Sequence, residues 1–437
     1  MSNPRQIAFE ALMKTYRDGA FSNLALDGIL SKSDLDTRDK SFVSNLFYGV
    51  IERQLTIDYQ LSLYLSKPLK KLKPEVLTIM RMGAYQVLYM DKVPDSAAVN
   101  ESIKLSKKNG ASYASGLINA VLRKVAKGGV ALPGNCSKSE YLSVKYSCPL
   151  WLVEKWINEY GYEDSAAFLE ASLGGADTFI RVNNTKITDD ELMTILVSEG
   201  VDCEKTYNEN TLKINLNGHD IEKLESFKKG YYHVQDMASQ LCAKALSAKE
   251  NDIVFDLCSA PGGKAYTVAE TMNDKGKVLC FDIYENRVSL IVKGAERLGL
   301  KSIIGGVGDA SVFNGELGLA DRVLCDVPCS GLGIIRRKPE IKYKSEADLS
   351  DLPEIQYAIV DNASKYVKNG GRLIYSTCTL SKAENENVVA KFLENHCNFK
   401  AVPVFSDKDS CCVTLMPHKN QSDGFFIACL ARDDKND

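Results

Sequence analysis

The chain contains few histidines and no CxxC pattern. Its four histidines, His219, His233, His396 and His418, lie far apart along the sequence. A structural zinc site normally draws on closely spaced cysteines and histidines. We therefore expect no metal site, and any catalytic chemistry is expected to depend on side chains and organic cofactors.

Long apolar runs are also absent, since no stretch approaches the ~20 residues of a membrane-spanning helix. Met1–Glu10 has no apolar core of a secretory signal. We expect a cytoplasmic protein without membrane attachment, whose 13 cysteines are thiols in a reducing compartment. Most would then pack as small apolar residues. Cys411 and Cys412 could form a redox pair, but simple burial or half-burial is the favoured interpretation.

The net charge is only −3, but the charge is unevenly distributed. Residues 1–130 hold 19 basic and 12 acidic residues, whereas the remainder holds 35 and 45. Lysine clusters at 67–73 and 104–108 contribute much of the positive charge. A basic module on an acidic body favours a polyanion-binding role for that module, while a solvated lysine-rich surface is the plain alternative.

Three domains are expected from the local patterns. Apolar residues recur at helical spacing through residues 1–130, which predicts an all-α domain ending at a glycine- and proline-containing linker. Residues 145–233 predict a helix over Leu150–Tyr160, followed by a small α+β domain. Residues 234–437 form the third expected domain.

Strands and helices alternate in residues 234–437, which is typical of a Rossmann-like, doubly wound and mainly parallel α/β sheet. The predicted strands are 253–258, 278–283, 302–307, 322–325, 372–376, 399–404 and 425–430. The predicted helices are 263–272, 287–298, 353–367 and 384–395.

The first of these strands leads into DLCSAPGGK, residues Asp256–Lys264. Its glycine pair permits close approach of the backbone to a ligand. Asp282 ends the second strand and suits a ribose diol, while Asp309 ends the third and suits an adenine amino group. A nicotinamide dehydrogenase stays possible. The lack of GxGxxG favours a nucleoside cofactor without pyrophosphate, and S-adenosylmethionine fits better.

Two cysteines follow neighbouring predicted strands: Cys329 in DVPCSG and Cys378 in YSTCTL. In an open parallel sheet such strand ends meet where ligands bind. Carbon 5 of a pyrimidine accepts a methyl group only after a thiolate adds to carbon 6. That chemistry needs a nucleophilic cysteine, an acid at the base such as Asp326, and help with proton removal. A nearby cation would favour the thiolate, and Lys264 is the candidate. The spacing leaves open which cysteine attacks.

These motifs resemble the RNA cytosine-C5 methyltransferases of the NOL1/NOP2/Sun family. The resemblance rests on residues 256–264, 281–287, 308–310, 326–343, 375–389 and 423–428. Residues 81–108 and 116–125 are similar to the NusB-type helical RNA-binding domain. Together they resemble the branch of the family that modifies bacterial small-subunit ribosomal RNA.

The resemblance implies a role for each matching residue. Cys378 would attack carbon 6 of the cytosine, Cys329 would assist product release, and Asp326 would hold the target base. The implied partner is 16S ribosomal RNA, and we expect a monomer. The S-adenosylmethionine contacts implied by the resemblance are Cys258, Ser259, Ala260, Pro261, Gly262, Gly263, Lys264, Asp282, Asp309 and Asp326.

Two positions depart from the family pattern. Tyr343 stands where the family often has Trp, and Cys148 where it often has His. Arg336–Lys338, after the Cys329 motif, are expected to meet RNA phosphates. Two other functions stay open: an RNA-binding assembly factor whose methyltransferase body is inert, and a cytosine methyltransferase acting on transfer RNA.

Overall fold

The computed structural model describes residues 3–18, 22–405 and 410–433. The chain divides into two compact units, residues 1–174 with 335–344, and residues 175–334 with 345–437. Residues 1–2 and 434–437, the outer ends of the expected first and third domains, lie outside the described residues. Within the described ranges, no helix is both long and apolar enough to cross a membrane.

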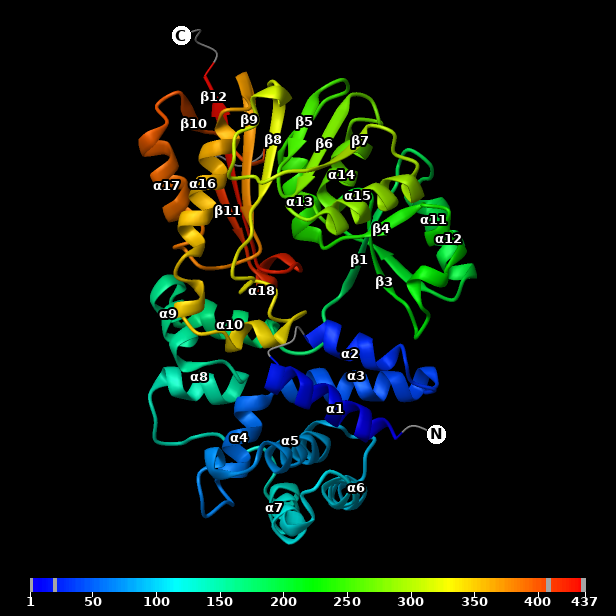
Figure 1. The fold of residues 1–437 in the computed structure, drawn as a ribbon, viewed down its shortest axis with the longest axis vertical. Helices are drawn as coiled ribbons and strands as arrows, with labels where there is room; N and C mark the ends of the chain where they lie inside the picture. Colours follow the sequence, from blue (N-terminus) through cyan, green and yellow to red (C-terminus); the bar gives the residue numbers. More distant parts are fainter. Residues whose placement is uncertain (1–2, 19–21, 406–409, 434–437) are drawn as a thin grey trace. The chain divides into compact units, whose positions relative to one another are not determined.

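The first unit is helical, as the apolar spacing predicts (Figure 1). Two of its helices, α8 and α10, were not predicted. α8 begins with a capping box in which Ser137 and Glu140 bond each other's backbone N–H groups. The helices are α1 Pro4–Asp18, α2 Ser22–Leu30, α3 Thr37–Glu52, α4 Gln54–Ser62, α5 Pro74–Tyr89, α6 Asp95–Lys108, α7 Ser115–Gly128, α8 Lys138–Tyr146, α9 Leu150–Tyr160 and α10 Tyr162–Ala171, with short 3-10 turns at Leu69–Lys71, Ser112–Ala114 and Pro339–Tyr343.

Close packing of α5 holds this unit together. A Cβ atom at Gly83 would lie 2.4 Å from a methyl group of Leu122 and 2.7 Å from the hydroxyl of Ser102, so α6 and α7 approach α5 where it lacks a side chain. On another side of α5, Arg81 makes a two-pronged ion pair with Asp58 of α4, at 2.7 and 2.6 Å. Such bidentate pairs fix geometry as well as adding energy.

The segment 335–344 belongs to the helical unit although it follows the Cys329 motif. The buried Lys342 ammonium donates to the backbone oxygen of Glu52 at 2.7 Å, and the Tyr343 hydroxyl donates to that of Ile51 at 2.9 Å. Burial lowers the pKa of Lys342 to about 8. Burial also raises the pKa of the Cys148 thiol to about 12, which the Lys342 charge opposes. The two departures from the family pattern, Tyr343 and Cys148, are therefore both neighbours of Lys342.

Tyr343→Phe tests this anchoring. Removing the hydroxyl leaves the oxygen of Ile51 without this donor, so the free energy of unfolding should fall by about 1 kcal/mol. Urea denaturation of the full chain measures it. Tyr113→Phe is the control, because Tyr113 is 63% exposed and its loss of a hydroxyl should change little. Equal midpoints for the two variants would contradict the anchoring.

The second unit begins with a small antiparallel sheet in the order β2-β3-β1-β4. The sequence indicates β1 and β3 but not β2, which is largely exposed, or β4, which has three residues. A buried contact between Arg181 and Glu270, 3.4 Å apart, links this sheet to helix α14 (Gly263–Thr271) of the larger domain. The elements are β1 Thr178–Val182, α11 Asp189–Ser198, β2 Asp202–Lys205, β3 Thr211–Asn215, α12 Glu225–Lys228 and β4 Tyr232–Val234.

The large sheet has the order β10-β12-β9-β8-β5-β6-β7, with β11 paired to β12. β5 to β9 pair in parallel, as predicted, while β10, β11 and β12 run antiparallel to their partners, so the sheet is mixed. β11 was not predicted; its four residues are mostly half-buried, which leaves only a weak strand pattern. The strands are β5 Ile253–Asp256, β6 Lys277–Asp282, β7 Ile303–Val307, β8 Ala320–Asp326, β9 Val367–Thr377, β10 Phe399–Ala401, β11 Cys412–Leu415 and β12 Phe425–Arg432.

Helices cover both faces of this sheet (Figure 1). Successive residues of a strand point to opposite faces. Thus Leu324 and Ile374 join the core under α13, α14 and α15, whereas Val323 and Leu373 join the core under α16 and α17. Asp256, Asp282 and Asp326, the last residues of β5, β6 and β8, belong to neither core. The helices are α13 Met237–Ala245, α14 Gly263–Thr271, α15 Glu285–Leu298, α16 Leu352–Ser364, α17 Glu386–Asn395 and α18 Pro417–Asn420.

Candidate active site

The two cysteines meet beyond the ends of adjacent parallel strands. Asp326, the last residue of β8, pairs with Ser376 near the end of β9. Cys329 and Cys378 follow three and two residues later, and their sulfur atoms lie 3.3 Å apart. The thiols are therefore in direct contact, so a group attached to one sulfur would lie next to the other.

The backbone fixes this arrangement. The amide of Gly333 donates to the carbonyl of Cys378 at 2.9 Å, and the amide of Gly424 donates to the carbonyl of Gly333 at 2.9 Å. A Cβ atom at Gly333 would lie 2.0 Å from the oxygen of Gly424. Three loops thus meet at a point where one of them can carry no side chain.

Asp326 is held by two donors. Lys264 donates to one carboxylate oxygen at 2.6 Å and Ser376 to the other at 2.9 Å. Burial works against the charge of Lys264, yet the Asp326 carboxylate outweighs it and raises the pKa of the lysine. Lys264 therefore stays charged, and its closest anionic partner is Asp326 at 2.6 Å.

The loop between β5 and α14 turns sharply at Gly262, whose φ of 105° requires glycine. The amide of Ser259 donates to the carbonyl of Phe281 at 2.8 Å, which ties the loop to β6. Asp256 is 1% exposed at the start of this loop. Burial raises its pKa to about 7, and the charge of Asp326 acts in the same direction.

A cavity of about 220 Å³ opens beside this loop. Asp282 and Asp309 follow the next strands of the same sheet edge but lie outside the cavity lining. Asp282 accepts from the amide of Tyr284 at 3.1 Å and pairs with Arg287 at 3.1 Å, and Asp309 accepts from Ser311. The cavity lining consists of Val234, Gln235, Asp236, Ser239, Asp256, Cys258, Ser259, Ala260, Pro261, Gly263, Lys264 and Asp326.

The environment of Cys329 disfavours its thiolate. Its pKa is raised well above the usual value, chiefly by the hydrogen bond with Cys378 and then by burial and by the charges of Cys378, Glu384 and Asp326. A thiol with a raised pKa keeps its proton, and its thiolate is the stronger base once formed.

Comparison with known protein families matches three parts of the chain. Residues 243–431 match the model of the 16S rRNA methyltransferase RsmB/F family. Residues 2–127 match the NusB family, and residues 148–218 match the ferredoxin-like domain of the RsmF/B-like methyltransferases.

Similar proteins extend over the whole chain. The chain is 35% identical to the "Probable ribosomal RNA small subunit methyltransferase B" of Bacillus subtilis (strain 168), over 98% of each protein. The chain belongs to the ribosomal RNA small subunit methyltransferase B (RsmB) family. A relative of the same description from Synechocystis is 32% identical over 99% of this chain and 100% of that protein. The crystal structure of PH0851 has a TM-score of 0.81 at 27% identity, covering 98% of this chain and 99% of the other.

Within this RsmB-family fold, the structure brings most of the expected site residues together. Cys329 contacts Cys378, Asp326 pairs with Lys264, and the charge of Asp326 acts on Cys329. Most residues of the loop 258–264 line the adjoining cavity. Sequence reasoning missed other members of the site, namely Ser376, Gln356 and Glu384. Ser376 was discoverable as the strand partner of Asp326, whereas the sequence gives no signal for the buried amide or carboxylate.

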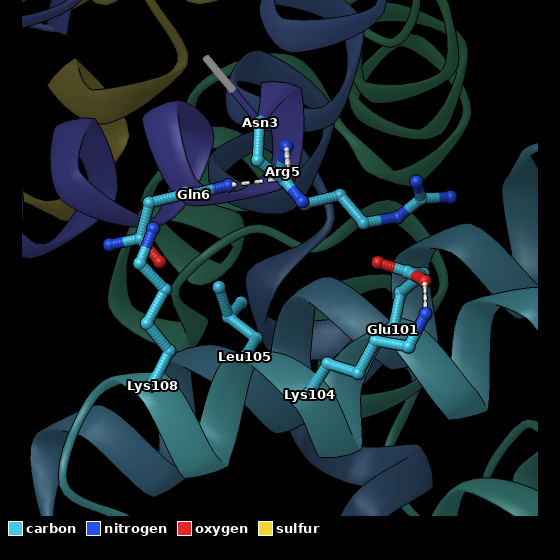
Figure 2. A pocket seen from close by; sticks show the side chains of 7 residues that line it. All are labelled: Asn3, Arg5, Gln6, Glu101, Lys104, Leu105 and Lys108. Atoms are coloured by element: carbon cyan, nitrogen blue, oxygen red, sulfur yellow. Dashed lines mark hydrogen bonds and ion pairs between the residues drawn. The ribbon is translucent and has the colours of Figure 1, made fainter. Parts of the chain in front are cut away.

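A second, smaller pocket lies in the helical unit. Figure 2 shows the three cationic side chains around it, with Lys104 directed at Glu101, 2.8 Å away. Arg5 is also engaged, donating to the side-chain oxygen of Gln86 at 2.6 Å. The lining thus holds three positive charges and one carboxylate, and the carboxylate is paired with Lys104. The pocket is lined by Asn3, Arg5, Gln6, Glu101, Lys104, Leu105 and Lys108.

Asp256→Asn tests the buried carboxylate. The folded-state pKa of Asp256 lies above its usual value of 3.8, so the folded protein holds a proton that the unfolded chain has lost, and stability falls as pH rises towards about 7. The variant should gain about 2 to 3 kcal/mol relative to wild type between about pH 5 and about pH 8. Urea unfolding of the ligand-free protein at both pH values measures it. The exposed Asp91→Asn should show no such trend, and a constant difference for Asp256→Asn would contradict its buried, raised pKa.

Proposed function

We propose that this RsmB-family protein methylates carbon 5 of a cytidine in 16S ribosomal RNA through a covalent bond between Cys378 and carbon 6. The observation that carries the proposal is the contact of Cys329 and Cys378, 3.3 Å apart, beside the Asp326–Lys264 pair. A methyltransferase acting on an already nucleophilic atom would need neither thiol.

The proposed reaction assigns a bond-making or proton-handling task to each side chain. The Cys378 thiolate forms a bond to carbon 6, which makes carbon 5 electron-rich. Asp326 hydrogen-bonds the base, and the positive charge of Lys264 beside it offsets the negative charge that develops on the ring. After the methyl group reaches carbon 5, the proton on that carbon passes to the sulfur of Cys329, which acts as a thiolate base, and the bond between Cys378 and carbon 6 breaks, which restores the ring double bond and frees the Cys378 thiolate. Cys329 touches the sulfur that must depart and assists this step.

The cavity beside residues 258–264 suits the proposed cofactor. S-adenosylmethionine, when bound, supplies an electrophilic methyl group on a sulfonium centre. The half-buried carboxylate of Asp326 at the cavity matches a ligand with positive charge, and the turn at Gly262 lets the backbone approach that ligand. Asp282 and Asp309 at the next strand ends would hold the ribose and the adenine.

The choice of RNA rests on relatives and on the helical unit. The relatives of matching length are described as ribosomal RNA small subunit methyltransferases B, and residues 2–127 match the NusB family. The excess of basic residues in residues 1–130 agrees with a polyanionic partner. Sequencing 5-methylcytidine in 16S and transfer RNA, with and without the protein, tests the choice; a site lost only from transfer RNA would contradict it.

Cys378→Ser should reduce methyl transfer to background, because a serine hydroxyl is not ionised near neutral pH and adds poorly to carbon 6. Transfer from labelled S-adenosylmethionine to 16S ribosomal RNA measures the effect. Cys397→Ser is the control, since Cys397 is an exposed thiol outside the site. Near-normal turnover by Cys378→Ser would remove the nucleophile assignment.

Cys329→Ala should trap the protein on RNA. The attacking thiol of Cys378 is kept, so the covalent bond forms, while its breakage slows because the neighbouring sulfur is gone. Denaturing gels of the variant mixed with RNA and S-adenosylmethionine should show a protein–RNA band. The double variant Cys329→Ala/Cys378→Ser should not show this band. Recovery of only free protein from Cys329→Ala would contradict the release role.

A further inference from the structure

A buried carboxylate lies directly behind the two cysteines. Glu384 is 2% exposed and follows Cys378 by six residues. One of its oxygens accepts from the amide of Ser330 at 2.8 Å, and the other accepts from the hydroxyl of Ser330 at 2.6 Å. Ser330 is the residue after Cys329, so both oxygens hold the Cys329 loop from one side.

Gln356 of α16 completes the hold on that loop. Its amide nitrogen donates to Glu384 at 3.0 Å and also to the backbone oxygen of Pro328 at 3.0 Å. Pro328 and Ser330 are the two neighbours of Cys329. Glu384 and Gln356 therefore hydrogen-bond the backbone on both sides of this cysteine, at Ser330 and at Pro328.

The same carboxylate reaches the Cys378 loop. The hydroxyl of Thr379, the residue after Cys378, lies 3.5 Å from Glu384 and 2.7 Å from the hydroxyl of Ser330. The Tyr375 hydroxyl, from the strand before Cys378, donates to the backbone oxygen of Glu384. Both cysteine loops thus attach to one residue, more tightly on the Cys329 side.

We propose that Glu384 is a positioning residue for the methyl-transfer site: its carboxylate sets the place of Cys329 beside Cys378 and is needed chiefly for release of the methylated base. The inference rests on the proposed roles of the two cysteines. The hydrogen bonds of the Glu384 side chain run to Ser330, Thr379 and Gln356, and Glu384 acts on the two cysteines through these residues.

The nature of the contacts supports this role. The donors to Glu384 are neutral groups, namely a backbone amide, hydroxyls and a side-chain amide. Hydrogen bonds to an ionised carboxylate are shorter and stronger than those between neutral groups, and they hold their donors in defined directions. The negative charge also contributes, after the contact with Cys378 and burial, to the raised pKa of the Cys329 thiol. Glu384 thus contributes both to the position of the Cys329 thiol and to its raised pKa.

Glu384→Gln is the direct test, because the side chain keeps its shape while an NH₂ group replaces one acceptor. We expect turnover to fall by about 10- to 100-fold, the range that a displacement near 1 Å produces. The affinity for S-adenosylmethionine should stay within about twofold of wild type, since the cofactor cavity does not involve Glu384. A covalent protein–RNA band should persist on denaturing gels, as for Cys329→Ala.

Two comparisons separate positioning from a loss of stability. Glu270→Gln is the matched control, because Glu270 is another buried carboxylate of the same unit, paired with Arg181; it should lower stability without accumulating the covalent band. Adding Glu384→Gln to Cys329→Ala should give no more band than Cys329→Ala alone, because both changes affect the same step. Should Glu384→Gln fail to fold, Ser330→Ala removes one hydroxyl contact and should shift turnover and band in the same direction.

The outcomes are distinct. Normal turnover of Glu384→Gln, or slow turnover without a persistent band, would overturn the positioning role while leaving the function of the cysteines intact. Absence of a Cys378-dependent band in Cys329→Ala would remove the release role first, and the role of Glu384 with it.

Discussion

Parallel pairing of β8 with β9 is the constraint on which the candidate site depends. The pairing of Asp326 with Ser376 puts a hydroxyl against the carboxylate, and the amide of Val327 extends the ladder by bonding the oxygen of Ser376 at 3.1 Å. Because the strands end together, the loops that follow them start side by side. The contact between Cys329 and Cys378 follows from that common start.

Charge balance around this strand end is local. Asp326 is matched by Lys264, whereas Glu384 is surrounded by neutral donors and Asp256 has a raised pKa. Asp256, Asp326 and Glu384 all lie around this strand end, and their carboxylates would repel one another if each were fully ionised. The structure meets this constraint by a different means for each: an ion pair, a set of hydrogen bonds and retention of a proton.

Much of the sheet was predictable because its strands are buried on both faces. Apolar runs such as 322–325 and 372–376, each followed by polar residues, predict both the strands and the sheet edge where ligands bind. The reversed direction of β12, which makes its pairing with β9, β10 and β11 antiparallel, was not predictable, since an apolar run does not reveal its direction. The order of the cysteine roles also came from family resemblance, because the spacing of Cys329 and Cys378 is compatible with attack by either.

The buried polar network was beyond sequence reasoning for a different reason. Glu384 falls at the start of a predicted helix, where an acidic residue is favoured by the helix dipole and needs no further explanation. The structure begins α17 at Glu386 and turns Glu384 inward instead. Likewise, the sequence around Lys342 is rich in basic residues, so it predicts an exposed lysine in a loop. A charged side chain is buried when residues far away in the sequence provide its hydrogen-bond partners. The residues next to it in the sequence do not reveal those partners.

The membership of residues 335–344 in the helical unit has a topological consequence. The chain passes between the two units three times, near residues 174, 334 and 344, so no single cut separates them. A fragment beginning at residue 175 would carry Pro339 and Ile341, both buried in the full chain, without the helices that bury them. The catalytic body is thus no independent module to which a helical domain has been appended. Residues 335–344, only a few positions beyond Cys329, are instead part of the helical unit and hydrogen-bond to its residues Ile51 and Glu52.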